Sequence, residues 1–131
     1  MLLDRIDIQV EVDSVPVSEI RGADASESSA AVRERVSQAR EIQAKRYEGT
    51  KVHCNAQLDN RGIETYCRMA KDAENLLHKA VERMNLSMRA YHRVMKVART
   101  VADLRGAKDV GVADVAEAIQ FRELDQKYWG A

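Results

Sequence analysis

The helical spacing of apolar residues in the middle of the chain is the strongest constraint on its fold. Apolar residues recur at steps of three or four over residues 71–84 and 88–104: Ala73, Leu77, Ala80 and Met84, then Tyr91, Val94, Met95, Ala98, Val101 and Ala102. Such stripes predict two amphipathic helices, each with one buried face. Because the break at Asn85 and Leu86 is short, we expect the two helices to be neighbours in a small bundle.

Three further helices are expected around this pair. One runs from a Ser28 or Ser29 cap to about residue 47, a short one covers about 59–67, and the last covers about 114–123. The first has a thin apolar stripe among many charged side chains, so we expect it at the periphery. A chain of 131 residues is long enough for one hydrophobic core.

Residues 6–12 have a different period from the rest of the chain. Ile6, Ile8, Val10 and Val12 alternate with polar residues, which predicts a β-strand with one buried face. A single strand leaves its backbone groups unpaired. Either two copies of the chain share their strands, or the partner strands lie outside this sequence. We therefore divide the chain into a strand and connector (1–27) and a helical domain (28–131).

Composition excludes several classes of function. The 21 basic and 21 acidic side chains balance, so any basic surface must be local. No apolar run approaches the roughly 20 residues that span a bilayer, and the N-terminus lacks a signal-peptide layout. We expect a cytoplasmic protein with no membrane partner. Cys54 and Cys67, with the three histidines, match no standard zinc spacing, so no metal site is predicted.

Motifs of self-contained enzymes are absent from the sequence. It has no GxxxxGK[ST] phosphate loop, no GxGxxG after a strand, no HExxH and no GxSxG. Whether the chain takes part in catalysis therefore depends on individual side chains rather than on a complete motif.

Two arginines are candidates for binding an anion. If Ser87 caps the helix over 88–104, Arg89 lies in its first turn, where the helix dipole favours anions and disfavours a cation. The anion there is either a local carboxylate, such as Glu82, or a bound phosphate or carboxylate ligand. Arg5 lies between Asp4 and Asp7, and it either pairs with one of them or extends toward a ligand on a neighbouring subunit.

The same helix carries a basic stripe formed by Arg89, Arg93, Lys96 and Thr100. Such a stripe can follow a nucleic-acid backbone with salt-dependent affinity. The alternatives are a solvated face or contact with an acidic neighbour, since no aromatic residues alternate with the charges as in single-strand binders. Arg99 and Asp103 are expected to pair with each other.

Four segments together resemble one protein family. LLDRIDIQVEV, SSAAVRERVSQAREIQAKRY, NLSMRAYHRVMKVARTVADL and DVAEAIQFR occur in this order and cover essentially the whole chain. They resemble the C-terminal portion of the magnesium-chelatase-like AAA+ ATPases, in the bacterial branch related to the competence-associated branch-migration helicase. The fold expected is mainly α, a helical bundle of the AAA+ lid type, preceded by one orphan β-strand from a truncated ATPase core.

The resemblance also implies roles for single residues. In that family a ring of subunits, usually a hexamer, binds ATP and Mg²⁺ between core and lid. Arg5 is similar to an arginine finger that acts on the neighbouring subunit's nucleotide, and Arg89 to the sensor-2 arginine of the subunit's own site. Without a phosphate loop the fragment alone is expected to be inactive and to hold no cofactor.

The resemblance leaves two questions open. The orphan strand either pairs with a second copy or packs irregularly on the bundle. The parent is expected to remodel DNA, in contact with its own upstream core and neighbouring subunits. The alternative is a stand-alone helical module that binds protein or DNA through Arg93 and Lys96.

Overall fold

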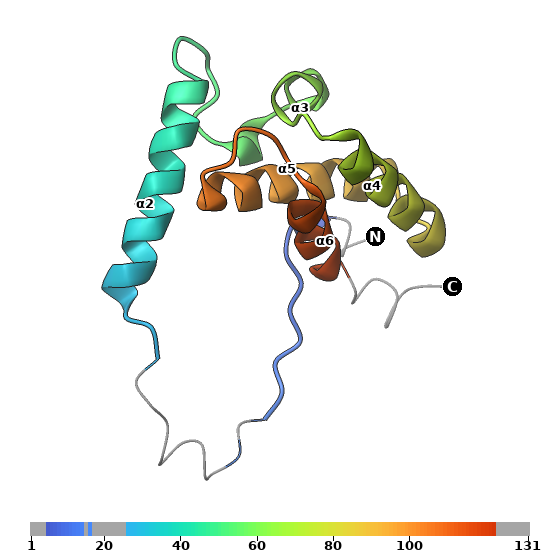
Figure 1. Cartoon of the computed structure of the whole chain (residues 1–131), viewed down its shortest axis with the longest axis horizontal. Helices are drawn as coiled ribbons and strands as arrows, with labels where there is room; N and C mark the ends of the chain where they lie inside the picture. The colour runs from blue at the N-terminus through green and yellow to red at the C-terminus, as the bar shows by residue number, and fades with distance from the viewer. Residues whose placement is uncertain (1–4, 15, 17–25, 123–131) are drawn as a thin grey trace.

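A computed structural model of the chain describes residues 5–14, 16 and 26–122 (Figure 1). In chain order its elements are α2 (Ser29–Arg46), the 3-10 turn η2 (Asn55–Gln57), α3 (Asn60–Tyr66), α4 (Lys71–Met84), α5 (Met88–Arg105) and α6 (Val112–Gln120). Within these ranges the β pairing consists of one isolated bridge, between Met69 and Val110. The predicted mainly helical fold is confirmed.

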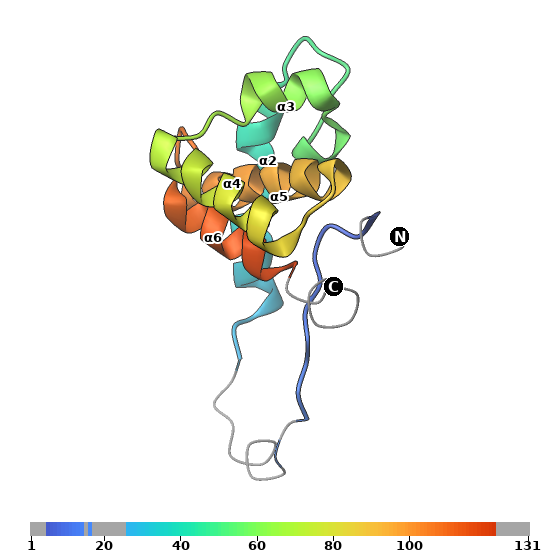
Figure 2. The same ribbon diagram turned by 90° about the vertical axis from the view of Figure 1, so that its right-hand side faces the viewer.

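The core lies between α4, α5 and α6, which pack together on one side of the molecule (Figures 1 and 2). Its apolar side chains come from the stripes that the sequence predicted, and Leu77, Val94 and Val115 are each no more than 1% exposed. α2 crosses the C-terminal part of α5 (Figure 1) and buries little apolar surface, with Val32 and Val36 exposed. The predicted peripheral position of α2 is confirmed.

Local chemistry sets where the helices begin and end. Asn85 adopts a left-handed conformation (φ 49°) between α4 and α5, and Gly106 does the same (φ 75°) after α5. α6 begins at Val112, two residues before the predicted start. The reason is that the Asp114 carboxylate accepts the Gly111 N–H at 2.9 Å, which places Asp114 inside the first turn.

The segment over residues 5–14 pairs with no strand in the described part of the chain. Its apolar side chains are exposed, from 38% at Ile6 to 84% at Val12, while Gln9 is 7% exposed. The described residues form no sheet that could cover the apolar face, so the burial predicted for that face is not seen among them. The segment contacts Phe121 and Arg122, directly after α6, and Arg93 of α5. Pairing of the segment with a second copy stays a prediction.

Several predictions fall outside the described residues. The end of the last predicted helix, beyond residue 122, lies there. The division of the chain at residues 27 and 28 stays a prediction. Among the described helices, none combines the length and apolar character needed to cross a membrane.

Candidate functional site

Arg89 lies in the first turn of α5, at the second helical position. The Ser87 hydroxyl accepts the Ala90 N–H at 3.1 Å and the Ser87 carbonyl accepts the Tyr91 N–H, so Ser87 is the predicted N-cap. Arg89 is exposed, and within the described residues its guanidinium has neither a hydrogen bond nor an ion pair. The local partner considered from the sequence, Glu82, does not pair with it.

This arrangement leaves a cation at the positive end of a helix dipole. The first turn of a helix presents N–H groups without intrahelical acceptors, and Ser87 provides acceptors for those of Ala90 and Tyr91. Met88 and Arg89 occupy the first two helical positions, so their N–H groups, beside the Arg89 guanidinium, have no acceptor within the helix. Backbone donors and a guanidinium at one helix end form an arrangement that can bind a phosphate or carboxylate.

Arg5 is also exposed, and it makes no hydrogen bond or ion pair with any described residue. Of the two acids beside it in the sequence, Asp4 lies outside the described residues. Asp7 forms an ion pair with Arg93 of α5 instead. The structure therefore does not bring Arg5 and Asp7 together as a pair.

The other members of the predicted basic stripe are engaged by the chain itself. Arg93 pairs with Asp7, and the Lys96 ammonium donates to the Ala56 carbonyl at 3.2 Å. Thr100 accepts a hydrogen bond from the Asn55 amide at 2.9 Å. Arg89 is thus the one stripe residue without a partner in the described chain. Binding of nucleic acid by Arg93 and Lys96 stays a prediction.

A buried polar cluster joins α2 to α5, and most of it was not predicted. Arg46 donates to both Asp103 oxygens at 2.9 and 2.5 Å, and Arg99 lies 3.1 Å from the same carboxylate. Asn55 donates to Asp103 at 2.9 Å and accepts from the Tyr47 hydroxyl. The hydrogen bond to Asp103 raises the pKa of Arg46. Of these contacts, the sequence predicted only the pair of Arg99 and Asp103, which lie four residues apart on one helix.

Comparison with known proteins decides the family. Residues 26–122 match the model of the family described as magnesium chelatase, subunit ChlI C-terminal. The match runs from before the start of α2 to the end of the described chain. The chain belongs to this family.

Individual relatives agree with the family match. Competence protein ComM of Haemophilus influenzae is 40% identical over 123 residues, which are 93% of this chain and 23% of ComM. The protein YifB of Salmonella typhimurium is 35% identical over 125 residues, 95% of this chain and 24% of YifB. The resemblance expected from the sequence is confirmed. The chain spans about a quarter of the length of these relatives.

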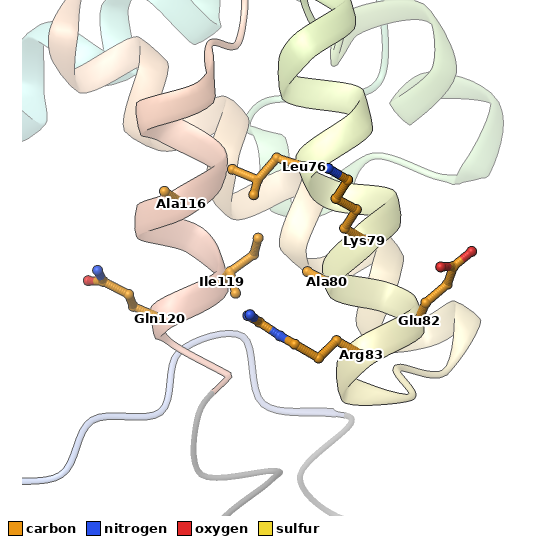
Figure 3. Close-up of a pocket in the computed structure, with 8 residues that line it drawn as sticks. All are labelled: Leu76, Lys79, Ala80, Glu82, Arg83, Ala116, Ile119 and Gln120. Carbon is orange, nitrogen blue, oxygen red and sulfur yellow. The ribbon is translucent and has the colours of Figure 1, made fainter.

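The helical domain also has an open groove of about 680 Å³ between α4 and α6 (Figure 3). Its lining is apolar in the middle and polar at the edges: Leu76, Ala80, Ala116 and Ile119, then Lys79, Glu82, Arg83 and Gln120. Neither Arg5 nor Arg89 lines it, so the groove is separate from the candidate anion site.

The cysteines of the domain are not joined to each other. Both are free thiols, and burial raises the pKa of Cys67 to about 11. Among the residues that the structure describes, no three His, Cys, Asp or Glu side chains are grouped to hold a metal ion.

Proposed function

We propose that this domain is the helical lid of a ring-forming, magnesium-chelatase-like AAA+ ATPase. ATP and Mg²⁺ would bind to a core that lies outside this chain, and the other partners would be neighbouring subunits of a hexameric ring. The family match and the similarity to ComM and YifB support this assignment. The existence of this ATPase core is itself part of the proposal, because the chain spans only about a quarter of the length of those relatives.

The observation that carries the proposal is the unpaired guanidinium of Arg89 at the start of α5. A cation in this position costs a few tenths to about 1 kcal/mol unless an anion lies nearby. A γ-phosphate oxygen of the subunit's own ATP would be that anion. As charge develops on the transferring phosphoryl group, the Arg89 guanidinium would stabilise it, which is the role of a sensor-2 residue.

Arg5 fits the second role, that of an arginine finger. Its side chain is exposed and has no partner in the described chain. It lies at the start of a segment whose apolar side chains are also exposed, as expected of residues that contact another domain or subunit. From such a contact Arg5 would reach the nucleotide of the neighbouring subunit. Arginine fingers contribute about 10³–10⁵-fold to turnover in other phosphoryl-transfer enzymes.

The test is ATP turnover of the longer protein that contains this chain, with Arg89→Ala and Arg5→Ala made separately. We expect each change to lower kcat by about 10³-fold or more. Arg33→Ala, which removes an exposed arginine of α2, is the matched control and should be neutral. Near-normal turnover in either variant would remove that arginine from its proposed role.

We further propose that the parent ATPase acts on DNA. The support is that one relative, ComM, is named a competence protein. Double-stranded and branched DNA should each be added to the turnover assay, and stimulation by DNA is the expected result. A rate that does not respond to either DNA would count against this substrate without affecting the lid assignment.

A further inference from the structure

The segment that carries Arg5 is held on the helical domain by polar contacts. Asp7 pairs with Arg93 of α5, and Arg122 donates to the Ile6 carbonyl. The Gln9 N–H donates to the Phe121 carbonyl at 3.0 Å. Because the apolar side chains of this segment are exposed, these contacts rather than apolar packing determine where the segment lies.

One of these contacts connects the segment to the helix of the candidate anion site. Arg93 follows Arg89 by four residues on α5, so the two side chains are neighbours on one helix face. Asp7, the partner of Arg93, is two residues from Arg5. α5 is the central helix of the bundle, in contact with both α2 and α6. One ion pair, between Arg93 and Asp7, therefore joins the Arg5 segment to α5, at a position one helical turn from Arg89 and two residues along the chain from Arg5.

We infer that Arg93 is a positioning residue that, through its ion pair with Asp7, fixes the Arg5 segment relative to Arg89. This inference rests on the proposed function of the two outer arginines. A movement of α5 that follows binding or loss of nucleotide at Arg89 would then move Arg5 at the neighbouring subunit. The ion pair would in this way carry the state of one nucleotide site to the next. Arg93 would act on protein geometry rather than on nucleic acid.

The first part of the test measures how the segment is held in this chain. Hydrogen exchange of the Gln9 amide, which reports the bond to Phe121, is compared in Arg93→Gln and in the unaltered chain. Loss of a partly exposed ion pair should speed exchange about three- to five-fold. Arg35→Gln, which breaks the exposed ion pair between Arg35 of α2 and Glu27 just before that helix, is the matched control and should leave the rate unchanged. Equal rates in Arg93→Gln and the unaltered chain would overturn the inference.

The second part measures coupling in the longer protein that contains this chain. Asp7→Asn and Arg93→Gln should each lower kcat about 10- to 100-fold with little change in KM for ATP, as expected when a reacting group is misplaced. Because the two residues act through one contact, the double variant should be no slower than the slower single variant. Arg93→Lys, which keeps the charge, should retain most of the turnover.

Arg5→Ala and Arg89→Ala are measured beside these variants so that two kinds of failure can be separated. If those two variants lose turnover while Arg93→Gln is normal, the positioning role is wrong and the proposed function stands. A double variant much slower than both single variants would also overturn the positioning role, since it would show independent effects. If Arg5→Ala and Arg89→Ala turn over normally, the proposed function itself fails.

Discussion

The two sides of α5 are held by different forces. On one side α5 packs with α4 and α6 through apolar residues such as Leu77, Val94 and Val115, each almost fully buried. On the other side it meets α2 through the buried polar cluster around Asp103 and Arg46. The apolar side provides stability with little directional constraint, whereas the polar side requires specific geometry because each buried charge needs its partner.

The buried polar cluster determines how α2 is held on α5. Asp103 is 1% exposed, accepts hydrogen bonds from Arg46 of α2 and Asn55 of η2, and forms an ion pair with Arg99 of α5. Taking these groups out of water is costly, so the cluster contributes little net stability when complete. Breaking it, however, leaves buried charge without compensation. The orientation of α2 on α5 should therefore be well defined yet sensitive to single changes.

Asp103→Ala should have the largest effect on the polar side. It leaves Arg99, 2% exposed, and Arg46 without their carboxylate, for an expected loss of about 3–5 kcal/mol in the free energy of unfolding. Urea denaturation followed by circular dichroism measures this loss. Asp109→Ala, which removes an exposed aspartate of the α5–α6 loop, is the matched control. A loss under 1 kcal/mol would show that the cluster does not hold α2.

Leu77→Ala is the corresponding change on the apolar side. Leu77 is fully buried between α4 and its neighbours, and its truncation should cost about 3 kcal/mol through lost burial and the cavity left behind. Leu104→Ala is the control, because Leu104 is 49% exposed and should cost much less. Similar losses for both leucines would contradict the position of the core between α4, α5 and α6.

Lowering the pH should weaken the contact between α5 and α6, with a smaller loss of stability than Asp103→Ala or Leu77→Ala causes. Burial alone would raise the pKa of Asp114, but hydrogen bonds from Arg105 and the Gly111 N–H outweigh it and lower that pKa below its ordinary 3.8. A carboxyl with a lowered pKa in the folded state stabilises above its ordinary pKa, and that stability is lost as pH falls through the folded value.

The measurement is a series of urea denaturations between pH 7 and pH 2. In the unaltered chain the free energy of unfolding should fall below about pH 4. In Asp114→Asn the part of this fall that Asp114 contributes should be missing, so the curve is flatter. Identical pH dependence in the two proteins would rule out Asp114 as a source of acid sensitivity.

Val36→Ser should have the smallest effect. Val36 is 47% exposed on the face of α2 that has few apolar neighbours, so the change should stay within about 0.5 kcal/mol. Its denaturation midpoint is compared with that of Asp103→Ala. A loss above 1 kcal/mol would mean that α2 depends on apolar packing after all.

The apolar side of the molecule could be predicted from the sequence, since periodicity is a local signal. The helix over 71–84 was predicted with the bounds that α4 has, and Ser87 was the predicted cap of α5. The start of α6 was misplaced because Asp114 also acts as an acceptor for Gly111 inside the first turn. The exposure of Ile8 and its neighbours was not predicted, because strand pairing is a long-range property that a local pattern does not report, and the described residues offer this segment no partner strand.

The candidate site was predictable only where it depends on local position. The cap at Ser87 places Arg89 in the first turn, and that placement is confirmed. The Arg46–Asp103 contact joins residues 57 apart and the Arg93–Asp7 contact joins residues 86 apart. Such pairs form only because the helices pack in a particular way. The sequence shows which residues are charged, but it does not show which of them come into contact.

The most direct test of the proposed site mixes two inactive variants of the longer protein, Arg5→Ala and Arg89→Ala, in equal amounts before assembly. If Arg89 serves its own subunit's nucleotide and Arg5 serves the neighbour's, a site is complete where an Arg5→Ala subunit receives the finger of an Arg89→Ala subunit. Random rings should then recover about a quarter of the unaltered turnover. Mixed rings that stay as inactive as either variant alone would contradict the account.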